Sequence, residues 1–514
     1  MRPSILAAGL ATALTVPAAA VQASSTAEIA ELRSMLEQMR TQYERRIQDL
    51  EDRLVQAERR SARAPAPATP AATDPAISQP MRAPSAGASA PAATASRLPD
   101  FRGALSSGAA FNPQISVILN GNYYNDGIDG SGAALVGQAL QPSGGSAHDH
   151  DHDHAQDADH GHSHGGLNNG FNFSEAELSF SATVDPYFDA AAYLAVMDEG
   201  DVHLEEAWLQ TRALPYGLRV KAGKFLSDFG YANKQHPHAW DFVDQNLAYL
   251  NLLGDHGLQD TGVQLTWLPE LPVYTLLGVE ALQGDQERFG ATLSDEDQER
   301  LGLDATEDGP RLWTLFAKVA PDLGLDHALQ VGVSYARNTQ HQEVHTHTHD
   351  GEDEIHENAL AGEADLWGVD LVYKYDSSGP QGQGDFKFQT EYLRSIKDLD
   401  IQSSPHPEII GSRRTFTTDG FYAQALYGFA PRWTAGVRYD VLGLTNEVSG
   451  DAHLDYGSSN RWSLNLTWKL SEFSQLRAQY ARNDILVAEN ERERFDAFYL
   501  QFLMSLGSHG AHAF

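Results

Sequence analysis

The chain has 514 residues, a formal net charge of −34 and no cysteine. The lack of thiols excludes disulfides and thiolate metal sites, and the strong acidity argues against nucleic acid as a partner and suits a protein that meets cations. After the first residues, no stretch is apolar over the length that a membrane-spanning helix needs.

The first 23 residues have the pattern of a secretory signal peptide. Arg2 precedes a short apolar run, and Val21 and Ala23 place small residues at the cleavage positions. The run is too short and too rich in alanine for a membrane anchor. We therefore expect residues 1–23 to be removed on export.

The next two segments predict a coil and a linker. In residues 27–58, apolar residues recur in three- and four-residue steps, with an extra four-residue step between Tyr43 and Ile47. This pattern predicts a periplasmic α-helical coiled coil whose seam needs partner chains, and we expect a homotrimer. Residues 61–100 are dominated by Ala, Pro and Ser, which cannot form a core, so they predict a disordered linker.

Residues 101–514 predict an all-β transmembrane barrel. Apolar and polar residues alternate with a period of two: Trp462 and Leu464 share one face, and Ser463 and Asn465 share the other. Short turns rich in Pro, Gly or Asp alternate with long connections, as in a membrane barrel. The long connections are expected at about 125–170, 227–257, 284–309, 338–364, 397–416 and 444–457. The count gives about sixteen antiparallel strands around a water-filled lumen.

Strand parity assigns the two ends of this barrel. The coil and linker come first, so the first strand (about 112–124) starts in the periplasm and every long connection lies outside the cell. The connection with His236, His238 and Asp241 is then external as well. Phe514, which closes an aromatic final segment, is typical of outer-membrane barrels.

Two histidine-rich tracts fall in these external connections. Residues 148–164 read HDHDHDHAQDADHGHSH, and residues 341–356 read HQEVHTHTHDGEDEIH. Imidazole is the commonest ligand for zinc, copper and nickel, and the neighbouring carboxylates attract a dication. The candidate metal ligands are His148, His150, His152, His154, His160, His162, His164, His341, His345, His347, His349 and His356.

Ligands so close together along a flexible backbone do not build a closed tetrahedral centre. We therefore expect several weak, exchanging sites in the two tracts. The residue types alone do not distinguish zinc from copper, nickel or cobalt. The alternative is a solvated low-complexity insertion that has no metal role.

The order of signal peptide, coiled coil, Pro/Ala linker and barrel resembles porins related to the phosphate-selective and siderophore porins. Residues 253–262 and 508–514 are similar to segments of zinc-regulated outer-membrane proteins with His-rich loops. The resemblance implies outer-membrane passage of zinc or a zinc complex. TonB-dependent zinc receptors also carry external His-rich loops, but they place a globular plug before a larger barrel. The coil and linker leave no room for a plug, so we expect diffusion without energy coupling.

The sequence therefore predicts an outer-membrane porin for passive uptake of a divalent metal, above all zinc or a zinc complex. The expected partners are outer-membrane lipids and divalent metal ions, and no cofactor is required. No recognisable Ser/His/Asp motif points to an enzyme. Two alternatives stay open. The mixed charges on the polar strand faces would suit a porin for an anionic solute such as phosphate or a metal–chelator complex. The tracts and the coil would suit a metal-buffering or envelope-anchoring protein.

Overall fold

The computed structural model describes residues 114–128, 131–139, 167–198, 200–348, 355–450, 453–488 and 491–507. The expected signal peptide, coiled coil and linker lie outside the described residues, and so does the whole tract 148–164, so these stay predictions. Among the described residues, no helix is long and apolar enough to cross a membrane.

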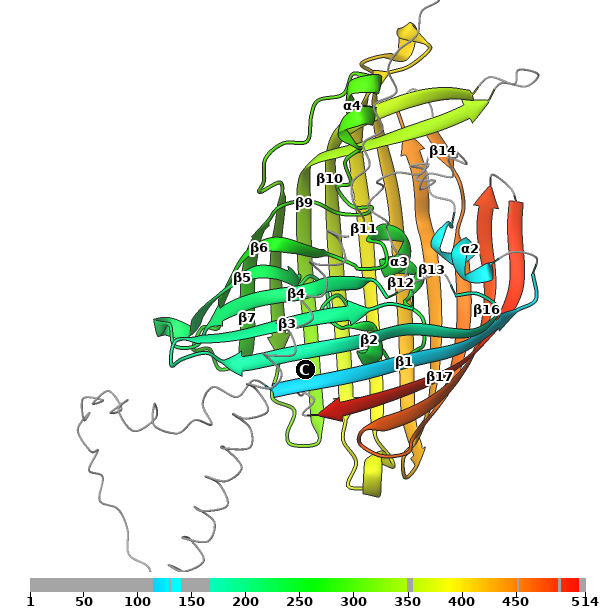
Figure 1. Ribbon diagram of the computed structural model, residues 1–514. Helices are drawn as coiled ribbons and strands as arrows, with labels where there is room; N and C mark the ends of the chain where they lie inside the picture. The colour runs from blue at the N-terminus through cyan, green and yellow to red at the C-terminus, as the bar shows by residue number, and fades with distance from the viewer. Residues whose placement is uncertain are drawn as a thin grey trace, which may run out of the picture. The chain divides into compact units, whose positions relative to one another are not determined.

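Seventeen strands of the described residues form one antiparallel sheet (Figure 1). The short strand β14 pairs only with β13, and the other sixteen close into a ring, because each pairs with the next in chain order and β1 pairs with β17. The structure thus confirms a closed barrel of sixteen strands. The strands are β1 (Gln114–Asp126), β2 (Gly170–Thr183), β3 (Phe188–Val196), β4 (Val202–Thr211), β5 (Leu218–Leu226), β6 (Gln259–Trp267), β7 (Tyr274–Leu282), β8 (Leu312–Ala320), β9 (His327–Thr348), β10 (Ile355–Tyr375), β11 (Phe386–Ser403), β12 (Arg413–Ala430), β13 (Trp433–Ser449), β14 (His453–Asp455), β15 (Ser459–Lys469), β16 (Ser474–Ala488) and β17 (Glu491–Gly507).

Short helices occur only in the connections of the described chain. The α-helices are α2 (Gly132–Gly137), α3 (Leu247–Leu252) and α4 (Asp295–Leu301). The 3-10 turns are η2 (Pro215–Gly217), η3 (Pro237–Ala239), η4 (Pro380–Gly382) and η5 (Pro407–Ile409).

The two faces of the wall differ as the alternation predicts. On β15, Trp462 and Leu464 are 52% and 55% exposed on the outside, whereas Arg461 and Ser463 are 1% and 0% exposed inside. An apolar outer face combined with a polar inner face is the arrangement of a barrel whose wall meets lipid. The barrel therefore buries its polar side chains in the lumen.

Three of the expected long connections are largely strand. β9 and β10 continue through most of residues 338–364, and β11 to β13 continue through much of 397–416 and 444–457. Beyond the apolar belt both faces of a strand can be polar, so the hydropathy alternation fades while the hydrogen-bond ladder continues. Part of the wall is consequently taller than the sequence pattern indicates (Figure 1).

The connection between β5 and β6 folds into the barrel. We call residues 227–258 the inward segment. Phe229, Leu247 and Tyr249 in it are no more than 1% exposed, and α3, which contacts β11, β12 and β13, is buried along its whole length. The segment does not extend away from the barrel as an open loop, so the expectation of a lumen filled with water is wrong here, while the external position of the connection stays a prediction. The apolar side chains of this segment are buried inside the ring of strands, where they have left water.

Candidate functional site

The inward segment is attached to the wall where it begins. The Ser227 hydroxyl donates a 2.5 Å hydrogen bond to Glu280 on β7. The backbone N–H groups of Tyr231 and Ala232 donate to the carboxylate of Glu391 on β11, at 2.8 and 3.0 Å. Buried N–H groups need such acceptors, so wall carboxylates fix the entry of the segment.

Gly230 makes this entry sterically feasible. Its φ of 61° lies in the left-handed region. A Cβ atom at this position would also collide with the hydroxyl of Tyr249 and the carboxylate of Glu391. Glycine alone meets both conditions without strain.

The far part of the segment is held by a buried group of opposite charges. Asp244 accepts from Arg438 on β13 and pairs with Arg461 on β15, both at 2.8 Å. Asp440 accepts from the same two guanidinium groups, at 2.9 and 3.1 Å. Burial would raise the pKa of Asp244, but the two arginines outweigh it and hold that pKa below its ordinary value.

The middle of the segment meets an acidic stretch of wall at His236. Its Nδ1 atom lies 2.9 Å from Oε2 of Glu205 and 3.3 Å from Oε2 of Glu177. Its Nε2 atom lies 2.7 Å from Oε1 of Glu206. His238 adds a second imidazole, with Nδ1 3.1 Å from Oε2 of Glu177. The inward segment thus brings two imidazoles into contact with three carboxylates of the wall strands β2 and β4.

A β-bulge explains why two consecutive glutamates face the lumen. In the pairing of β3 with β4, Tyr193 opposes Glu206 and Leu194 opposes Leu204, so the strand register skips Glu205. A bulge lets neighbouring side chains share a face that regular alternation would separate. Glu205 and Glu206 are accordingly 5% and 8% exposed.

Local backbone structure also sets the position of His236. It precedes Pro237, and the residue before a proline is held in extended backbone. Its ring stacks on Tyr193 of β3, with centroids 4.9 Å apart. Burial alone would lower the pKa of His236, but hydrogen bonds to Glu205 and Glu206 and the charge of Glu177 outweigh it and raise the pKa well above the ordinary value.

The acidic stretch contains carboxylate oxygens that lack normal hydrogen bonds. Glu175 and Glu177 lie two residues apart on β2, share the lumenal face and are each 1% exposed. Both oxygens of Glu175, and Oε2 of Glu177, have no hydrogen bond of normal geometry within the described part of the chain. A buried carboxylate in this state is costly unless it takes up a proton, is hydrated or has a cation nearby.

A small cavity borders this stretch. It has a volume of about 60 Å³ and is lined by Glu205 and His236 on one side and by Asp244 and Arg438 on another. A water needs roughly 10–15 Å³ of such space, so a few waters fit. The acidic stretch is therefore accessible to water along the inward segment.

Four of the twelve predicted ligands lie on β9 and β10, and the structure describes the side chains of three. His341 and His345 share a face of β9, and their Nε2 atoms lie 2.9 and 2.7 Å from the two oxygens of Glu343. Lys397 of β11 also donates to Glu343, at 2.9 Å. This carboxylate therefore already has three partners, one of them a fixed positive charge.

His356 is the third predicted ligand whose side chain is described, and it has a different neighbour. His356 on β10 stacks on His406, with ring centroids 5.4 Å apart. His347 is described only as backbone, paired in register with His356. His349 and the seven histidines of residues 148–164 lie outside the described residues, so their metal role stays a prediction.

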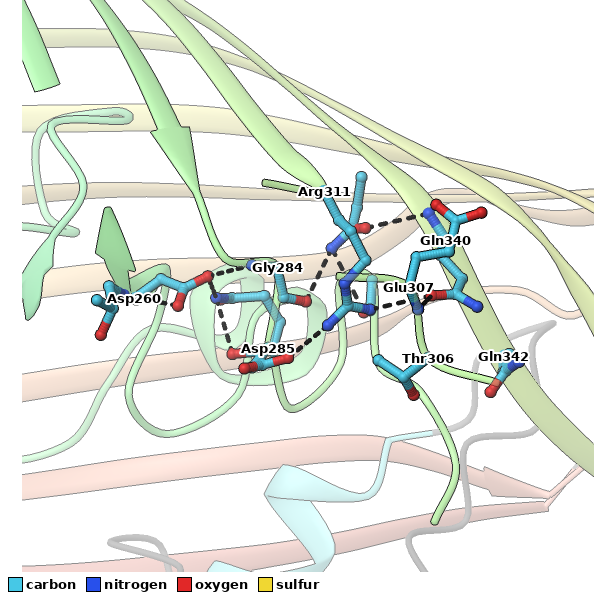
Figure 2. Close-up of polar contacts among 12 residues, drawn as sticks. Asp260, Gly284, Asp285, Thr306, Glu307, Arg311, Gln340 and Gln342 are labelled. Carbon is cyan, nitrogen blue, oxygen red and sulfur yellow. Dashed lines mark hydrogen bonds and ion pairs between the residues drawn. The ribbon is translucent and has the colours of Figure 1, made fainter. Parts of the chain in front are cut away.

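A second connection, residues 283–311, is tied to the same rim (Figure 2). Arg311 is 1% exposed and pairs with Asp285. The side-chain oxygen of Gln340 on β9 accepts from Arg311 at 3.4 Å and from the backbone of Glu307 at 2.9 Å. The histidine-bearing hairpin and this connection therefore form one joined rim.

Glu177 and Glu205 are among the mixed charges expected on the polar strand faces, but their meeting with His236 was not predicted. One signal was present in the sequence. In a regular strand that crosses lipid, Glu205 and Glu206 would point to opposite faces, and a carboxylate facing lipid is unfavourable. A bulge that turns both inward is the structural way to avoid that.

Comparison with known proteins identifies relatives of the chain. The sequence profile described as "TonB dependent receptor-like, beta-barrel" matches residues 239–483. Structural likeness is found to OmpT of Vibrio cholerae (11% identity, 77% of this chain and 97% of that chain, TM-score 0.43) and to the outer membrane channel DcaP of Acinetobacter baumannii (13%, 77% and 96%, 0.43). Another likeness is to OccK1 (OpdK) of Pseudomonas aeruginosa (14%, 77% and 99%, 0.36).

The sequence relative is an uncharacterized protein of Aquifex aeolicus (strain VF5), 36% identical over 349 residues, which are 67% of this chain and 70% of the relative. The chain belongs to the same protein family as this Aquifex aeolicus protein, and its described residues form a closed sixteen-stranded β-barrel.

Proposed function

We propose that the protein is a passive channel that admits divalent metal cations, above all zinc, through the outer membrane. The observation that carries the proposal is the acidic stretch on the lumenal wall, four buried carboxylates beside the inward segment: Glu175, Glu177, Glu205 and Glu206. Rings and patches of carboxylates line the paths of cation channels, because they replace part of the hydration that an ion loses.

The two arginines that contact the far part of the inward segment do not favour an anionic substrate. Arg438 and Arg461 are buried against Asp244 and Asp440, so their charge is neutralised within the protein. Beside His236 and His238, the four carboxylates of the acidic stretch outnumber the imidazoles that contact them. This distribution supports a cation channel over a porin for phosphate or a metal–chelator complex.

The histidine tracts and the coil have supporting roles in this proposal. The tracts gather dications at the external mouth, where weak and exchanging sites let an ion move on. The coil joins three copies of the chain in the periplasm. Passive diffusion is favoured over energy coupling because the segment that occupies the described lumen is the barrel's own β5–β6 connection. Plugged outer-membrane transporters have about 22 strands, and this barrel has sixteen.

The test is zinc entry into liposomes that contain the purified full chain and an internal zinc indicator. We expect zinc uptake down its gradient, without any energy source, and faster than uptake of phosphate by the same vesicles. Vesicles that bind zinc outside but admit none would contradict the channel and favour the metal-buffering alternative. Faster entry of phosphate would favour an anion porin.

A further inference from the structure

We infer that Glu177, Glu205 and Nδ1 of His236 together bind one divalent transition-metal ion of the zinc type inside the lumen. The three ligand atoms lie within 4.8 Å of one another. The inference deepens the proposed function and rests on it for the identity of the ion and its route to the site. The binding itself can be measured without any flux.

The spacing of the ligand atoms fits a small dication. Nδ1 of His236 lies 2.9 Å from Oε2 of Glu205 and 3.3 Å from Oε2 of Glu177. Zinc bonds to nitrogen and oxygen of about 2.0–2.1 Å in a tetrahedron place neighbouring ligand atoms about 3.3 Å apart. Both distances to Nδ1 lie within a few tenths of an ångström of that spacing, and the two carboxylate oxygens lie within 4.8 Å of each other.

The second nitrogen of the ring already has the partner that a metal-bound imidazole needs. Nε2 of His236 lies 2.7 Å from Oε1 of Glu206, so this nitrogen carries the proton and donates it when Nδ1 is the ligand. A carboxylate behind a ligating histidine fixes the ring tautomer and orientation. Stacking on Tyr193 restricts the ring further.

The charge of the site selects for a dication. Glu177 and Glu205 together neutralise two positive charges, whereas a monovalent ion would leave one buried negative charge uncompensated. Glu175, with both oxygens buried and without normal hydrogen bonds, is the second sign that a cation belongs here. A buried carboxylate in this state gains most from nearby positive charge.

The ligands come from three separate parts of the backbone: β2, β4 and the inward segment. Ligands from separated backbone points build a defined metal site, which the consecutive histidines of the tracts do not. A bound ion would join the inward segment to the wall at its middle. Two of the three ligands, Glu205 and His236, line the small cavity, so part of the site borders a space that holds water-sized groups.

The competing explanation is a metal-free latch, in which a protonated His236 is simply the counter-charge of Glu205 and Glu206. Crystals of the full chain soaked in zinc, with data collected at the zinc absorption edge, separate the two. We expect an anomalous difference peak between the three ligand atoms. The peak should vanish in the double variant E177Q/E205Q. It should persist in the control variant H327Q, because His327 on β9 hydrogen-bonds to Tyr373 and is not one of the three ligands. A wild-type map without the peak would overturn the inference.

Calorimetric zinc titration of the chelator-treated protein in detergent gives a second readout. E206Q should keep the peak but weaken the zinc affinity of one site by about 10–100-fold, the usual effect of removing a partner behind a ligand. Unchanged affinity in E177Q/E205Q would overturn the site, provided that the variant keeps the heat-dependent gel mobility of a folded barrel. Zinc flux without the peak would refute the site and leave the proposed channel standing. The peak without flux would support the site and refute the proposed channel.

Discussion

Nδ1 of His236 in the inward segment lies 2.9 Å from Oε2 of Glu205 on the barrel wall. This contact joins the two features that give the lumen its chemistry. The wall provides carboxylates, and the segment that narrows the lumen provides the imidazole. Any ion that passes along this side of the segment meets both groups.

The buried ion pairs of Asp244 with Arg438 and Arg461 hold the far part of the inward segment against the wall. Replacing Asp244 by Asn removes a buried partner of Arg438 and Arg461, and breaking such a pair costs about 3–5 kcal/mol of folding free energy. We expect D244N to unfold at lower temperature and to show larger and noisier single-channel conductance in planar bilayers. D308N, which changes an exposed aspartate elsewhere, is the matched control. Equal conductance of D244N and the wild type would show that these ion pairs do not restrain the segment.

A second tie depends on pH. His256 in the inward segment contacts Glu287 in the 283–311 connection. Burial lowers the pKa of His256, but the hydrogen bond and charge of Glu287 outweigh it and raise that pKa, while His256 outweighs burial and lowers the pKa of Glu287. Asp255 and Glu205 also face the imidazole and raise its pKa.

The sign of the pH effect follows from these directions. The His256 contribution is complete below the ordinary histidine pKa of about 6.5 and is lost as pH rises through the raised value. The Glu287 contribution is complete above about 4.3 and is lost as pH falls through the lowered value. We expect H256Q to lower the melting temperature most between about pH 5 and 6, and progressively less at alkaline pH. A difference that grows with rising pH would contradict the pairing.

The histidine tracts should matter only when metal is scarce. We expect deletion of residues 148–164, combined with glutamine at the five histidines of the second tract, to slow zinc uptake at low concentration by about tenfold, the lower range for electrostatic focusing. At saturating zinc the two proteins should transport equally, because the channel itself is unchanged. Zinc uptake into proteoliposomes across a concentration series measures this. Identical curves would remove the tracts from the transport mechanism.

The predicted coil should determine the oligomer. Deleting residues 27–58 removes a seam that needs partner helices, so we expect the purified protein in detergent to shift from trimer to smaller species. Light scattering coupled to size exclusion measures the protein mass directly. An unchanged trimer would assign assembly to the barrel alone.

The strands were predictable because lipid imposes a simple rule. Each crossing residue faces either lipid or lumen, so Trp462 and Leu464 must alternate with Arg461 and Ser463. Counting such segments gives the sixteen strands that close the ring. The extent of the rim was underestimated because β9 and β10 lose their hydropathy alternation beyond the belt, although their ladder continues.

The candidate site was not predictable in the same way. The inward segment is a connection by position, and its direction depends on distant partners such as Glu391 and Arg438, more than 100 residues away along the chain. The meeting of Glu205 and His236 needs both that direction and the bulge in β4. The adjacent glutamates of β4 indicate the bulge, but no local sequence pattern contains the direction of the segment.

The most direct test of the account is the reversal potential of the purified full chain in a planar bilayer that separates two concentrations of a zinc salt. The account predicts the sign of a cation-selective pore, reduced toward zero in E177Q/E205Q and unchanged in H327Q. The sign of an anion-selective pore, or equal selectivity in all three proteins, would contradict the claim that the acidic stretch on β2 and β4 admits the ion.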